Sequence, residues 1–112
     1  MSGTGPDGLN AGGGSGFDGE VGERVARLAE LLDFPTSFPI KIMGAQSEAF
    51  IESVIGVVQR HAPDFDARTL EKRPSRQGTY LGLTATIRAT SREQLDALYR
   101  ELTSHPLVKV VL

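Results

Sequence analysis

Apolar residues recur with two different periods between residue 38 and the C-terminus. Alternation at every second position, typical of a strand with one buried face, occurs in four segments: 38–43, 65–73, 80–89 and 107–112. Spacing of three and four residues, typical of an amphipathic helix, begins after Ser47 and again after Ser91. Both serines are suitable N-caps, and Pro63 ends the first helix. The pattern therefore predicts the order strand, helix, strand, strand, helix, strand.

This order predicts an α+β fold of the ferredoxin-like βαββαβ type. The connection rules give a four-stranded antiparallel sheet in the order 4-1-3-2, with both helices on the face that carries Ile40, Leu83 and Val110. Segment 65–73 is weak in apolar residues and is followed by Pro74, so it is expected at an edge of the sheet. Because this fold hosts many unrelated functions, it does not specify a chemistry.

The face of the sheet opposite the helices should be bare, with a mixed basic and apolar surface. The alternation places these residues on it: Lys41, Met43, Tyr80, Thr84, Thr86, Arg88, Lys109 and Val111. Lys41, Arg88 and Lys109 fall on three adjacent strands, where like charges repel unless something compensates them. Acidic residues of an N-terminal helix, an anionic partner and plain solvation are three open explanations. Together with Met43, Tyr80 and Val111, these charges form a candidate surface for a protein partner or for self-association.

The N-terminal part of the chain has a different composition. Residues 1–22 hold nine of the 13 glycines and few apolar residues, so they are expected to be disordered. A short helix with one apolar edge is predicted in 23–34, and 35–112 should form the folded domain. Residues 14–19 match the dinucleotide pattern G-x-G-x-x-G, but no strand precedes them, so a linker accounts for the match.

Composition excludes several classes of protein. The chain has no cysteine, which excludes disulfides, thiolate nucleophiles and cysteine-based metal sites. No segment approaches the roughly 20 apolar residues of a membrane span, and 1–22 lacks the basic start of a secretory signal. We therefore expect a cytoplasmic protein. The net charge of −2 and the single aromatic, Tyr80, on the bare face argue against a nucleic-acid partner.

The candidate ligand site is the turn Gly44-Ala45-Gln46-Ser47, which joins a central strand to a helix whose first amides can bind an anion or a carboxylate. A capped helix start explains the same residues. The only histidines, His61 and His105, lie at element boundaries without carboxylates at metal spacing. No local set of serine, histidine and carboxylate can be drawn. We therefore expect no catalytic residues, no metal and no cofactor, with a small anionic or amino-acid ligand as an open possibility at the turn.

Several strings read together resemble a known family. They are LLDFP at 31–35, FPIKIMG at 38–44, VVQRHAP at 57–63, G-x-Y at 78–80 and LYREL at 98–102. They resemble the YbeD-like family of small bacterial proteins of unknown function, over about residues 29–112. The resemblance implies a fold similar to the ACT domains that bind amino acids and control metabolic enzymes, and a link to lipoate metabolism. It supplies no catalytic motif.

The sequence thus favours a non-catalytic, ACT-like regulatory module that acts through association, with small-ligand sensing as a refinement. The alternative is an enzyme or an enzyme-accessory protein linked to lipoate or amino-acid metabolism. A deep pocket lined by polar groups near Gln46 would favour a ligand or a reaction, and a flat sheet would favour a partner.

Overall fold

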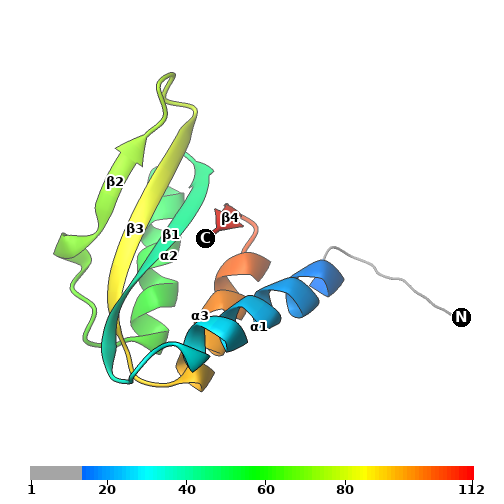
Figure 1. Ribbon diagram of the computed structural model, residues 1–112. Coiled ribbons are helices and arrows are strands. Elements are labelled where there is room, and N and C mark those ends of the chain that lie inside the picture. Colours follow the sequence, from blue (N-terminus) through cyan, green and yellow to red (C-terminus); the bar gives the residue numbers. More distant parts are fainter. Residues whose placement is uncertain (1–13) are drawn as a thin grey trace, which may run out of the picture.

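The secondary structure follows the expected order, and the predicted N-terminal helix precedes it. The computed structural model describes residues 14–112 (Figure 1). Its helices and strands are α1 (Gly14–Glu30), β1 (Thr36–Ala45), α2 (Glu48–His61), β2 (Glu71–Pro74), β3 (Tyr80–Ala89), α3 (Arg92–Ser104) and β4 (Val108–Val111). A single 3₁₀ turn, η2 (Ala67–Thr69), precedes β2.

The four strands form one antiparallel sheet in the order β2-β3-β1-β4, which confirms the predicted ferredoxin-like topology. The central strands pair over their full length, from Thr36 opposite Ala89 to Ala45 opposite Tyr80. The edge strands are short, and β2 covers only the Leu81 end of β3. The two central strands therefore carry most of the sheet.

The core lies between one face of this sheet and the helices, and it is built from the two predicted apolar periods. β1 and β3 bury alternate residues, while α2 and α3 bury one stripe each. The buried side chains of the helices are Phe50, Val54, Val57 and Val58 in α2 and Leu95, Leu98, Tyr99 and Leu102 in α3. Ser47 and Ser91 cap the two helices as expected, because each Oγ accepts a backbone N–H three residues later at 3.1 Å.

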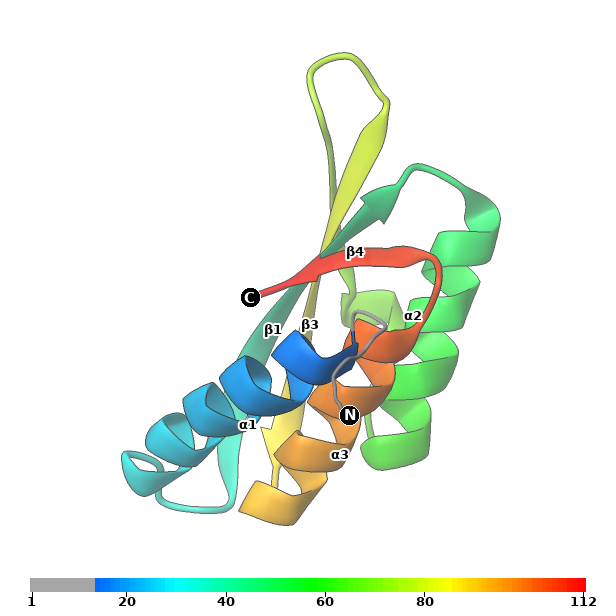
Figure 2. The same cartoon turned by 90° about the vertical axis from the view of Figure 1, so that its right-hand side faces the viewer.

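The N-terminal helix begins earlier than predicted and docks on the helical layer. α1 begins at Gly14, so 14–22 are helical, whereas residues 1–13 of the expected disordered tail lie outside the described residues. The glycine motif at 14–19 is therefore the start of a helix and not a linker. α1 packs beside α3, and the helices form one layer in the order α2, α3, α1 (Figure 2). Val25 is fully buried there, and Arg24 Nη2 donates to the carbonyl oxygen of Val111 at 3.3 Å. This docking stabilises a helix whose local composition does not favour one.

The predicted strand 65–73 is only partly a strand. Asp66 accepts the backbone N–H of Arg68 at 2.9 Å, and this local bond starts the 3₁₀ turn η2. The Arg68 side chain also bonds to Asp66 and holds the pKa of that carboxyl below its usual value. Phe65 and Leu70 are buried on either side of η2. A strand therefore begins only at Glu71, at the expected edge of the sheet.

Val108 packs against the core as the alternation predicts, but the rest of the last strand faces the opposite way from the prediction. Its pairing with β1 shifts register between Met43 and Gly44, so one extra residue of β4 is accommodated by a bulge. Val111 pairs with Ile42 and is buried, whereas Val110 is 44% exposed. Alternation from the sequence assumed a regular ladder, and a shift of one residue exchanges the two faces. Val110 as a core residue and Val111 as a surface residue were therefore both wrong.

Gly44, at the end of β1, is required by packing. A Cβ added there would lie 2.5 Å from the carbonyl oxygen of Leu107 and 2.6 Å from the ring of Phe50. The strand, the start of α2 and the loop before β4 approach each other at this point. Glycine is the residue that permits such an approach.

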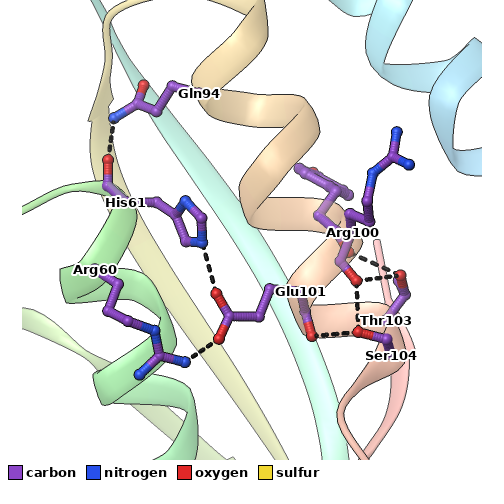
Figure 3. Close-up of polar contacts among 8 residues, drawn as sticks. Arg60, His61, Gln94, Arg100, Glu101, Thr103 and Ser104 are labelled. Carbon is purple, nitrogen blue, oxygen red and sulfur yellow. Dashed lines mark hydrogen bonds and ion pairs between the residues drawn. The ribbon is translucent and has the colours of Figure 1, made fainter.

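Glu101 ties the end of α2 to α3 (Figure 3). Its carboxylate is paired with the guanidinium of Arg60, and its Oε1 lies 2.7 Å from His61 Nε2. The Arg60 bond is the main cause that holds the pKa of Glu101 below its usual value, and the His61 bond acts in the same direction. Next to this cluster, Gln94 Nε2 donates to the carbonyl oxygen of His61 at 2.9 Å.

We expect Gly44→Ala to lower the free energy of unfolding by about 1–3 kcal/mol, because the added methyl group must displace backbone and an aromatic ring. The matched control is Gly82→Ala, where the new Cβ meets only an ordinary contact of 3.6 Å with the carbonyl oxygen of Arg73. Urea titration followed by circular dichroism measures both. Equal stabilities of the two variants would contradict the packing role of Gly44.

Glu101→Gln should weaken the contact between α2 and α3 by up to about 1 kcal/mol at neutral pH, since the carboxylate is one-third exposed. Because the pKa of Glu101 is lowered in the folded state, its carboxylate stabilises the fold at pH values above the ordinary carboxyl pKa. This contribution is lost as the pH falls through the lowered pKa. The difference from the wild type should therefore vanish in acid.

The control for this pH series is Glu52→Gln, an exposed carboxylate on α2 without an ion pair among the described residues. Urea midpoints at a series of pH values give the measurement. A difference between wild type and Glu101→Gln that does not change with pH would exclude an electrostatic cause.

Candidate functional site

The open face of the sheet, defined as the face without helices, remains uncovered in the described structure (Figures 1 and 2). Lys41, Met43, Tyr80 and Arg88 are exposed on it, as predicted. Lys109 is also exposed, and it is the extra residue of the bulge in β4. In place of Val111, this face carries Val110 and, beside Lys41, the terminal Leu112, whose N–H donates to the carbonyl oxygen of Lys41 at 2.8 Å.

Strand register arranges the side chains of the open face in rows across the sheet. One row runs through Arg73, Gly82, Met43 and Val110. The next row runs through Glu71, Thr84, Lys41 and Leu112. Gly82 lies on a central strand between Tyr80 and Thr84 and contributes no side chain to its row. The face is therefore hollow at this row.

This hollow is part of a groove of about 500 Å³. Residues of β3 form its floor, and the other side chains of the open face form its two walls. The β2 wall consists of residues 71–75, and the opposite wall contains Lys41, Met43 and Leu112. Tyr80, Met43 and Leu112 are between 40% and 58% exposed, so the groove offers apolar surface to solvent. Sequence analysis missed Gly82, Arg73 and Leu112 as parts of a site.

Charges are segregated between the two layers of the domain. The four strands and the β2–β3 loop carry six exposed basic residues, Lys41, Lys72, Arg73, Arg76, Arg88 and Lys109, and one acidic residue, Glu71. Among the described residues, none of these six is in an ion pair. α1 lies against α3 and not across the open face, and within the described range Glu23, Glu30 and Asp33 form no ion pair with Lys41, Arg88 or Lys109. An anionic partner and solvation remain as explanations.

The turn Gly44-Ala45-Gln46-Ser47 has structural roles that account for most of its groups. Leu107 and Phe50 occupy the space beside Gly44, the Gln46 N–H donates to the carbonyl oxygen of Thr79 at 3.1 Å, and Ser47 caps α2. None of the four residues lines the groove on the open face. Ligand binding at the turn stays a prediction, and the groove lies elsewhere on the sheet.

The two histidines are engaged in local contacts. His61 bonds to Glu101, and His105 Nδ1 accepts the N–H of Leu107 at 3.1 Å. Within residues 14–112, no three metal-ligating side chains gather into a group. In the same range, no helix is long and apolar enough to cross a membrane.

Comparison with known proteins places the domain in a family. The model of the family described as "Protein of unknown function (DUF493)" matches residues 29–112, so the family domain begins in the last turn of α1. The chain is 51% identical over 88 residues to a UPF0250 protein of Leptothrix cholodnii, an alignment that covers 79% of this chain and 97% of the relative. It is 56% identical over 82 residues to a UPF0250 protein of Ralstonia nicotianae, covering 73% and 84% respectively. A UPF0250 protein of Paraburkholderia phytofirmans is also 56% identical over 82 residues, covering 73% of this chain and 92% of the relative. The chain therefore belongs to the DUF493 family of proteins of unknown function, which is the YbeD-like family that its sequence strings resemble.

Proposed function

We propose that the protein is a non-catalytic, cytoplasmic module that binds an acidic protein surface through the open face of its sheet. The observation that carries this proposal is the segregation of charge: the strands and their hairpin loop carry six exposed basic residues against one acidic residue, and register places Lys41, Arg73 and Arg88 on the open face. The whole chain is slightly acidic, so this concentration is local. A concentrated positive face attracts an acidic partner and speeds the encounter.

The apolar part of the open face supports a protein partner. Met43, Val110 and Leu112 neighbour one another across β1 and β4, and Tyr80 lies at the end of β3 beside them. Tyrosine, methionine and arginine are enriched in protein interfaces, whereas isolated charges on a solvated sheet need no such companions. Solvation alone explains the charges but not this grouping.

Self-association through the sheet has weaker support. Two open faces brought together would bring two surfaces with an excess of basic residues into contact. The outer edge of β2 ends in Pro74, which has no N–H to donate to an added strand. On the other edge, Arg24 of α1 already bonds to the carbonyl oxygen of Val111. The charges therefore disfavour face-to-face pairing of two copies, and both edges disfavour pairing by strand addition.

An enzyme is the less supported alternative. The groove contains one carboxylate, Glu71, and no histidine, so it lacks the acid and base pair that most hydrolytic or proton-transfer reactions need. Regulation by a small ligand remains compatible with binding a partner.

Charge reversal tests the proposed function. We expect the double variant Lys41→Glu, Arg73→Glu to capture at least ten-fold less of a protein that the wild type captures from an extract of the native host. The reason is that its open face becomes acidic. Arg27→Glu, Arg92→Glu is the control, since it changes the net charge equally at exposed positions of α1 and α3. Quantitative mass spectrometry gives the captured proteins, and circular dichroism verifies the fold.

The same set of captured proteins with wild type, open-face variant and control would contradict the proposal. So would a loss shared by both variants, which would indicate that the net charge and not the open face controls binding.

A further inference from the structure

Gly82 has no internal reason to be glycine. It is the third residue of β3, and glycine inside a strand usually weakens it. An added Cβ would meet only an ordinary 3.6 Å contact, in contrast to the severe overlaps at Gly44. Its backbone is not in the left-handed region, unlike that of Gly78, whose φ is +75°. Neither the backbone conformation nor the packing within the described chain therefore requires position 82 to lack a side chain. The effect of that lack is the hollow on the open face.

The surroundings of Gly82 combine apolar and basic groups. Along β3 the hollow is bordered by Tyr80 and Thr84, and Met43 lies opposite it on β1. Arg73 and Lys41 stand on β2 and β1, the strands on either side of β3, which lie two strand spacings or about 10 Å apart, and the two residues belong to neighbouring rows. A ligand group bound over Gly82 would therefore contact Tyr80 and Met43 and would have Arg73 on one side and Lys41 on the other.

We propose that the groove over Gly82 is an anchor site for an acidic peptide segment, which inserts one aliphatic or aromatic side chain and pairs its neighbouring carboxylates with Lys41 and Arg73. This inference rests on the proposed function and specifies the chemistry of the partner. A groove of about 500 Å³ lies within the usual range of binding sites and is larger than one side chain, so part of the adjoining backbone enters with it.

Charge complementarity selects this occupant. A guanidinium such as that of Arg73 matches a carboxylate in a bidentate geometry, and Lys41 provides a second, more flexible cation. Glu71 stands in the row of Lys41 but on the opposite wall, at β2, so within that row a carboxylate is favoured beside Lys41 and disfavoured beside β2. The β2 wall thus carries a positive charge at Arg73 and a negative charge at Glu71, and this order gives a bound segment a preferred direction.

Nuclear magnetic resonance titration of the ¹⁵N-labelled full chain tests the anchor site with a defined probe. The probe is the acetylated and amidated hexapeptide DELFED, and its neutral twin is NQLFQN with the same ends. We expect saturable shifts of the amides of Tyr80, Gly82 and Thr84 with the acidic peptide, and at least ten-fold weaker binding of the neutral peptide.

Gly82→Val is the decisive variant, because valine fills the hollow and improves the strand propensity. It should weaken binding of the acidic peptide at least ten-fold while leaving the thermal midpoint equal or higher. Thr86→Val is the matched control, since it adds the same side chain to the same strand and face outside the groove, opposite Pro39. Its affinity should equal that of the wild type.

Three results would overturn the anchor site: no shifts with the acidic peptide, equal binding of the neutral twin, or unchanged affinity of Gly82→Val. Shifts centred on residues 44–47 would also overturn it and would favour the start of α2. The fate of the proposed function is separate. If Gly82→Val still captures the protein that Lys41→Glu, Arg73→Glu loses, the open face is the interface and the groove is not its anchor.

Discussion

The full-length antiparallel pairing of β1 with β3 is the constraint on which the rest of the structure depends. Ten residues of each strand face each other in regular register, so their side chains separate strictly onto two faces. One face carries the apolar residues that α2 and α3 cover, and these fully buried side chains hold the helices in place. The opposite face carries the remaining alternate residues of β1 and β3, including Lys41, Met43 and Gly82 with its hollow. The core and the candidate site are therefore two results of one pairing.

The elements that could be predicted are those with strong periodicity and large apolar stripes. β1, β3, α2 and α3 each repeat one period over ten residues or more, and their caps and order gave the topology. The other elements depend on contacts that a local pattern does not contain. α1 is stabilised by docking on α3, η2 by the bond from Asp66, and the orientation of β4 by the bulge opposite Met43. In each of these cases a tertiary contact or a local hydrogen bond set the extent or the orientation of the element, which the spacing of apolar residues did not indicate.

The candidate site divides in the same way. Lys41, Met43, Tyr80 and Arg88 were predicted on the open face because they lie on the two regular strands. Arg73 and Leu112 were missed because their strands, β2 and β4, have irregular starts or bulges. Gly82 gave one usable signal, since an isolated glycine inside a strongly alternating strand marks a close approach or an opening. The segregation of charge was hidden in the sequence because the helices and their loops offset the basic sheet.

The central claim of this account is that the open face, and not the helical layer, contacts a partner in the cell. Site-specific photo-crosslinking measures this contact most directly. A benzophenone amino acid replaces Tyr80 on the open face in one strain and Ala97, which is exposed on α3, in another. After irradiation of living cells, we expect a crosslinked protein adduct from position 80 that is absent from position 97. No adduct from position 80, or the same adduct from both positions, would contradict the account.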